Sequence, residues 1–163
     1  MTPTETSLKN FQSDVDQGMA ENVPKKPGFL LPLTVLEVGT EQQLDFPRDW
    51  QHKLWSAGFL GMHWPTQYGG QGSDAAYQGV VDKALTAHNA PIIFNTIGLN
   101  WTGPLLLDVG TEEDRQRYIK NILTGDEIWC QGFSEPDHGS DLGNVQTKAV
   151  RDGDEYIVNG SKI

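Results

Sequence analysis

Residues 129–141 read Trp-Cys-Gln-Gly-Phe-Ser-Glu-Pro-Asp-His-Gly-Ser-Asp. This stretch predicts a strand over 128–133 that runs into a turn rich in glycine, proline and serine. Glycine permits close approach of the backbone to a ligand, and serine donates a hydrogen bond without adding charge. Such a loop could hold an anionic or heteroaromatic ligand, but ordinary connections use the same residue types. Residue types alone leave both interpretations open.

The sequence downstream of this loop indicates a hairpin. Segments 147–151 and 156–159 have strand character and flank Asp152-Gly153, a strong short-range signal for a tight turn. Residues 127–163 are therefore predicted to be the first strands of an antiparallel β-domain.

The sequence upstream of residue 126 has helical periodicity instead. Helices are expected over 6–21, from the first turn at Pro47 to Gly58, from the cap Ser73 to about Asn89, over 92–108, and from the cap Thr111 to Gly125. The segment 92–108 is apolar nearly all round, so we expect it inside a bundle or along the wall of an apolar cavity. Residues 1–126 are predicted to form an all-α domain, which makes the fold class α+β.

Composition excludes several classes of function. The chain has 163 residues, a formal net charge of −10 and one cysteine. This charge opposes binding to nucleic acid, and a lone cysteine provides neither an internal disulfide nor a metal cluster. No secretory or transit leader is visible, and no apolar run approaches the roughly 20 residues that a bilayer span needs. We expect a cytoplasmic protein with no membrane span and no metal site.

Several ordered motifs resemble those of the acyl-CoA dehydrogenase family. They are Trp64-Pro65 with Tyr68-Gly69-Gly70 and Gly72, then Gly110-Thr111-Glu112-Glu113, then residues 129–136 with Gly139-Ser140-Asp141-Leu142, and finally residues 150–163. The similarity extends from about residue 8 to the last residue. A single Gly-Ser-Asp would carry no weight, but this order and spacing are specific.

The resemblance implies an N-terminal helical domain and the beginning of a middle β-domain. The family's C-terminal helical bundle has no counterpart in these residues, and FAD lies between the middle domain and that bundle. Gln131, Phe133 and Ser134 are expected along the flavin ring. Gly139 and Ser140 are expected near the FAD pyrophosphate, with Ser140 also contacting the CoA pantetheine. Asp137-His138 departs from the family pattern, which has small residues there.

The activity implied by the resemblance is oxidation of an acyl-CoA thioester to the trans-2-enoyl-CoA, with hydride transfer to flavin. Family members usually place the catalytic glutamate in the C-terminal bundle, so no catalytic residue is assigned here. Typical partners are an electron-transfer flavoprotein as electron acceptor and further subunits in a homo- or heterotetramer. A non-catalytic subunit or binding module of the same fold, and a flavin-dependent oxidase or monooxygenase, remain alternatives.

Four side chains near the loop have simpler explanations than catalysis. We expect His138 to be an exposed turn residue and Cys130 a small buried hydrophobe. Glu135 is expected to accept backbone hydrogen bonds within the turn, and Asp141 to cap the segment that follows.

Overall fold

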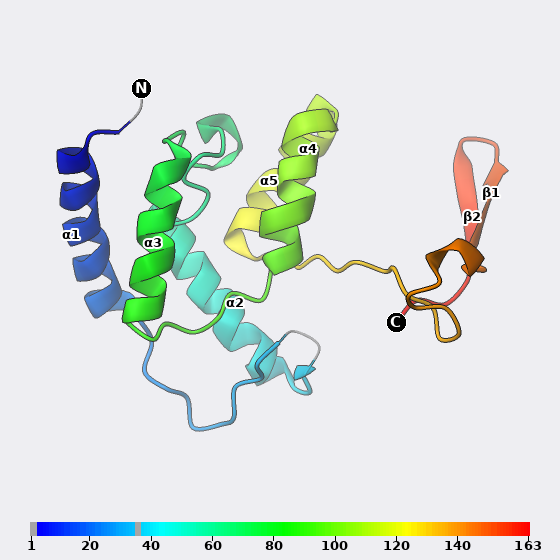
Figure 1. The fold of residues 1–163 in the computed structure, drawn as a ribbon, viewed down its shortest axis with the longest axis horizontal. Coiled ribbons are helices and arrows are strands. Elements are labelled where there is room, and N and C mark those ends of the chain that lie inside the picture. The colour runs from blue at the N-terminus through cyan, green and yellow to red at the C-terminus, as the bar shows by residue number, and fades with distance from the viewer. Residues whose placement is uncertain (1–2, 35–36) are drawn as a thin grey trace. The chain divides into compact units, whose positions relative to one another are not determined.

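The computed structural model describes residues 3–34 and 37–163. The chain divides into two compact units, Met1–Trp129 and Cys130–Ile163, whose elements are drawn in Figure 1. The first unit contains the α-helices, and the second contains a two-stranded antiparallel sheet. The expected α+β class is therefore confirmed.

None of the helices in the described ranges has the length and apolar character that a membrane crossing requires.

Helices α1 (Glu5–Asn22) and α3 (Ala75–Ala87) pack side by side (Figure 1). Phe11, Val15 and Met19 recur at every fourth residue, a pattern that predicted the α1 helix correctly, and Val15 and Met19 are fully buried. The cap of α3 was misplaced by one residue. Asp74 caps it by accepting the Ala76 N–H at 2.9 Å, whereas the Ser73 N–H donates to the Met62 carbonyl at 2.7 Å.

Helix α2 (Glu41–Ser56) begins six residues before Pro47, so the predicted start was wrong. Thr40 is the N-cap and accepts the Gln43 N–H at 3.3 Å, while the Gln43 side chain accepts the Gly39 N–H at 2.9 Å. The spacing Thr-x-x-Gln is the local signal that identifies this start. Pro47 is tolerated inside the helix, where it is buried.

The helix expected over 92–108 is shorter and irregular. Helical turns begin at residue 96, pass through a π-helical segment η3 (Gly98–Thr102) and continue as α4 (Gly103–Val109). Pro104 offers no N–H to the preceding turn, which is a physical reason for the widened turn. The segment is not enclosed within a bundle, because Trp101 and Leu105 are 55% and 59% exposed. Its residues Ile92, Ile93 and Leu99 instead line a cleft.

Helix α5 (Glu112–Thr124) matches its prediction. Thr111 and Asp114 form a reciprocal capping box at its start, and Gly125 ends it with a positive φ of 83°. The α5 helix packs against α2 and α4. Its residues Ile119, Ile122 and Leu123 are fully buried in the core together with Trp50 and Leu54 of α2.

The second unit contains the hairpin of β1 (Lys148–Asp152) and β2 (Glu155–Asn159). The hairpin was predicted correctly, but the turn residues are Gly153 and Asp154, because Asp152 pairs with Glu155. The strand expected over 128–133 is absent from the described structure, which shows only an isolated bridge between Glu135 and His138 nearby. Strand character alone does not create a strand when no neighbouring strand pairs with it.

Candidate functional site

The five residues predicted to contact a cofactor all lie in the second unit. Gln131 and Phe133 are exposed, Ser134 is half-buried, and Gly139 and Ser140 are exposed in the turn that follows. The Ser134 carbonyl accepts the Ile163 N–H at 2.9 Å, which fixes the backbone between Phe133 and Glu135. The segment therefore presents an aromatic face, an amide and a hydroxyl to solvent.

The departure from the family pattern at Asp137-His138 lies in a tight turn. Glu135 and His138 exchange both backbone hydrogen bonds, with N to O distances of 2.9 and 3.1 Å, and so close a tight turn. A hollow of about 220 Å³ borders this turn. It is lined by Glu135, Pro136, Asp137, His138, Gln146, Thr147, Gly160 and Ser161, and by none of the five predicted cofactor residues.

The Glu135 carboxylate holds the turn to the start of the hairpin. Glu135 is 5% exposed, and its two oxygens accept the N–H groups of Gln146 at 2.7 Å and Thr147 at 2.8 Å. The Lys162 ammonium lies 3.1 Å from the same carboxylate and donates to the Phe133 carbonyl at 2.9 Å. Glu135 is thus occupied as a backbone acceptor, as expected. The participation of Lys162 was missed, because the two residues lie far apart in the sequence.

These contacts lower the pKa of Glu135 to about 2. The Thr147 side chain is the largest cause, followed by the Gln146 N–H. The Thr147 hydroxyl nevertheless finds no partner of hydrogen-bond geometry within the described structure, so the two backbone N–H groups are the well-formed donors. A carboxylate held ionised in this way is poorly suited to accept a proton near neutral pH.

Acid is expected to open the turn around Glu135. Its folded pKa of about 2 lies below the ordinary glutamate pKa of 4.5, so the carboxylate stabilises the fold above about pH 4.5 and loses this effect as the pH falls towards 2. Hydrogen exchange of the Gln146 and Thr147 amides in the full-length polypeptide, measured against pH, should show protection falling across this window. The variant Glu135→Gln should have a flat profile. Wild-type protection that stays unchanged down to pH 2 would contradict the assignment.

The helical unit contains a larger cleft of about 510 Å³. Its apolar lining includes Trp64, Leu85 and Leu99, and its polar lining includes Gln78, Asp82 and Asn100. The Gln78 amide donates to the Asp82 carboxylate at 3.1 Å. The cleft lies within the size range of small-molecule pockets. Ile92, Ile93 and Leu99 belong to its lining, which agrees with the expectation that the segment 92–108 forms the wall of a cavity.

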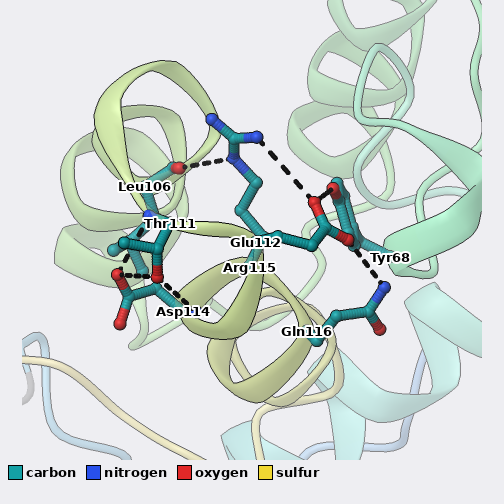
Figure 2. Close-up of polar contacts among 7 residues, drawn as sticks. All are labelled: Tyr68, Leu106, Thr111, Glu112, Asp114, Arg115 and Gln116. Atoms are coloured by element: carbon teal, nitrogen blue, oxygen red, sulfur yellow. Dashed lines mark hydrogen bonds and ion pairs between the residues drawn. The ribbon is translucent and has the colours of Figure 1, made fainter.

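A polar cluster holds the loop that contains Trp64 and Tyr68 against α5. Figure 2 shows Glu112 accepting hydrogen bonds from the Tyr68 hydroxyl at 2.6 Å and from the Gln116 amide at 3.0 Å. The Arg115 side chain also donates to the Leu106 carbonyl at 3.1 Å, which ties α5 to α4. The Tyr68 and Gln116 hydrogen bonds lower the pKa of Glu112, and the Thr111 side chain lowers the pKa of Asp114. The cluster supports the wall of the cleft that contains Trp64.

No group of three or more His, Cys, Asp and Glu in the described ranges is arranged to hold a metal ion. Cys130 is exposed, so the expectation that it is a buried hydrophobe was wrong. The strand in which it was expected to lie does not form, which leaves it uncovered.

Comparison with known proteins gives consistent matches. Residues 33–126 match the family model described as "Acyl-CoA dehydrogenase, N-terminal domain". "Acyl-CoA dehydrogenase IpdE1" of Mycolicibacterium smegmatis is 33% identical over 167 residues, which cover 96% of this chain and 42% of that protein.

Solved structures resemble the whole chain. One described as "Tcur3481-Tcur3483 steroid ACAD" has a TM-score of 0.69 at 32% identity, over 100% of this chain and 41% of that one. The "ChsE4-ChsE5 complex from Mycobacterium tuberculosis" has a TM-score of 0.71 at 28% identity, over 100% of this chain and 39% of that one. The chain thus spans about two fifths of the length of these relatives.

Proposed function

The chain belongs to the acyl-CoA dehydrogenase family, and from this premise we propose that it is part of an FAD-dependent enzyme that oxidises an acyl-CoA thioester to the trans-2-enoyl-CoA. The observation that supports this most directly is the segment 131–140. It offers an exposed aromatic ring, amide and hydroxyl groups, and it follows the helical unit directly in sequence.

The residues present fit FAD in their chemistry. The phenyl ring of Phe133 is 56% exposed and provides an apolar face for a flavin ring. Gln131 and Ser134 provide uncharged donors for its polar edge, while Gly139 and Ser140 suit a pyrophosphate. A Cβ added at Gly139 would meet no atom within 4 Å, so the backbone there is open to an approaching group. When bound, FAD would supply the hydride acceptor.

The chain's own part in the reaction is binding and orientation. Ser140 would donate to an anionic oxygen of FAD or of the CoA ester. Glu135 would keep the turn in shape through Gln146 and Thr147, with its negative charge balanced by Lys162. No residue of this chain is assigned as the base that removes the Cα proton.

The cleft of the helical unit is proposed to receive part of the acyl group. Leu99 lines this cleft, whereas Ile97, two residues before it, does not, so Leu99 is positioned to contact a ligand there and Ile97 is not. The polar groups of Gln78, Asp82 and Asn100 favour an acyl group that carries hydrogen-bonding substituents over a plain alkyl chain. The similarity to a structure described as a steroid ACAD supports the same class.

We propose an electron-transfer flavoprotein as the electron acceptor, a homo- or heterotetrameric assembly and a cytoplasmic location. The similarity to a complex of two named components supports a heteromeric assembly. It also supports a second candidate function, in which this chain belongs to a non-catalytic subunit of such a complex.

Flavin absorbance and turnover test the proposal. The full-length polypeptide should purify with bound flavin, and an acyl-CoA should bleach that flavin and reduce an artificial electron acceptor. Bound flavin without turnover would favour the non-catalytic subunit. A complete absence of flavin uptake, even with excess FAD, would refute the proposal.

Replacing Ser140 by alanine is expected to weaken binding of FAD or of the CoA ester by roughly 1–3 kcal/mol, because an anionic oxygen loses its donor. Equilibrium dialysis with FAD and titration with acyl-CoA measure the two affinities. Ser161→Ala is a matched control, since Ser161 is also exposed in this unit but has no proposed role. Unchanged affinities for both ligands would remove Ser140 from the site.

A further inference from the structure

Asn95 is a fully buried polar residue inside an otherwise apolar stretch. It is 0% exposed. Its amide nitrogen donates to the Ile122 carbonyl at 3.0 Å and to the Glu127 carbonyl at 2.9 Å, and its side-chain oxygen accepts the Trp129 N–H at 3.0 Å. The amide thus uses both donors and its acceptor within the helical unit.

These contacts connect three segments. The Asn95 carbonyl also accepts the Leu99 N–H at 2.9 Å, so the residue begins the turn that leads into η3. Ile122 lies in the last turn of α5, and residues 127–129 are the last residues of the helical unit. A Cβ at Gly98 would lie 2.3 Å from the Asn95 amide oxygen, so glycine at this position leaves room for the amide where it lies.

Gln51 provides a natural comparison within the same core. It is 2% exposed, and its amide donates to the Ile122 carbonyl at 2.7 Å and to the Leu123 carbonyl at 3.0 Å. Gln51 therefore satisfies carbonyls at the end of α5, as Asn95 does. Only Asn95 reaches beyond the helix to Glu127 and Trp129.

We propose that Asn95 is a positioning residue, which sets the backbone of residues 127–129 immediately before the flavin-binding segment. This inference rests on the proposed function for Gln131, Phe133 and Ser134. Trp129 is additionally held by an edge-on contact with Tyr118, with ring centroids 5.4 Å apart. The Glu127 N–H also donates to the Asn121 carbonyl at 3.1 Å. The Asn95 amide adds hydrogen bonds to the Glu127 carbonyl and the Trp129 N–H, and so fixes the backbone on both sides of Ile128.

The test compares Asn95→Ala with Gln51→Ala in the full-length polypeptide. Both variants remove a buried amide and leave the Ile122 carbonyl with one donor fewer, so their losses of overall stability should be comparable. Only Asn95→Ala should speed hydrogen exchange at the Trp129 amide, by about tenfold or more, because it removes the acceptor of that N–H. It should also weaken flavin binding by about tenfold and shift the flavin absorption spectrum.

A second variant covers the case in which Asn95→Ala does not fold. Asn95→Asp preserves the shape of the side chain and the acceptor for the Trp129 N–H, but it loses donors to Ile122 and Glu127. Burial against two carbonyl oxygens favours the protonated carboxyl, which can donate one bond, so this variant should give an intermediate change in exchange and in the flavin spectrum.

The outcomes separate the inference from the proposed function. If wild type binds flavin and the Asn95 and Gln51 variants change exchange and flavin binding equally, Asn95 only satisfies the end of α5 and the inference is wrong. If wild type takes up no flavin, the proposed function fails, and the role of Asn95 towards flavin fails with it. Changes confined to the Asn95 variants in both measurements support the positioning role.

Discussion

Replacing Gly70 by alanine should destabilise the helical unit by about 3 kcal/mol, because the added methyl group has no space. Its Cβ would lie 2.3 Å from the Trp64 carbonyl oxygen and 2.6 Å from the Trp64 Cβ. That carbonyl cannot move freely, since it accepts the Gly72 N–H at 2.8 Å and Trp64 is only 2% exposed. Urea unfolding followed by far-UV circular dichroism measures the change.

Gly79→Ala is the matched control for this prediction. Gly79 lies within α3, and a Cβ there would meet no atom within 4 Å. Alanine favours helix over glycine by about 0.5–1 kcal/mol, so this variant should be stabilised. If both variants had the same stability as wild type, the loop around Trp64 would not be packed as described.

The second large effect concerns residues 1–163 expressed alone. The helical unit should fold, because it has its own buried core in the part of the chain described. The chain should nevertheless fail to retain FAD or oxidise an acyl-CoA. Every residue of β1 and β2 is exposed, and the hairpin shows hydrophobic residues such as Val150 at 60% and Tyr156 at 63% exposure.

An isolated two-stranded hairpin is marginally stable in water, and exposed strand edges favour association between chains. We therefore expect these residues alone to form colourless oligomers. Size-exclusion chromatography, flavin absorbance and titration with acyl-CoA and an artificial electron acceptor test this. A monodisperse yellow protein with turnover would overturn the expectation and would require a catalytic base within these residues.

The cofactor segment, residues 131–140, shows which features of a site can be predicted from the sequence alone. The types and order of residues 131–140 identified a turn, and Glu135 was correctly expected to accept backbone hydrogen bonds in it. The roles of Gln131, Phe133, Ser134, Gly139 and Ser140 towards FAD remain predictions, which the Ser140→Ala experiment begins to test. Whether residues 128–133 form a strand depends on a neighbouring strand, and no local pattern reports on that.

The sequence by itself determined the features that depend on neighbours within one or two turns of chain. The apolar spacing of α1, the capping box of Thr111 and Asp114 at the start of α5 and the hairpin after Thr147 are all local in this sense, since helix hydrogen bonds and caps join residues three or four apart. The start predicted for α2 was too late, although the sequence contains the Thr-x-x-Gln signal that marks the correct start.

Only the tertiary structure decided which distant polar groups meet. Gln51 and Asn95 reach the same Ile122 carbonyl from positions 71 and 27 residues away, and Lys162 reaches the Phe133 carbonyl from 29 residues away. A buried amide must find partners wherever the folded chain brings carbonyl and N–H groups within about 3 Å. This requirement explains why Gln51 and Asn95 are hydrogen-bonded in the core. The partners of all three residues are set by the path of the backbone and not by the adjacent sequence.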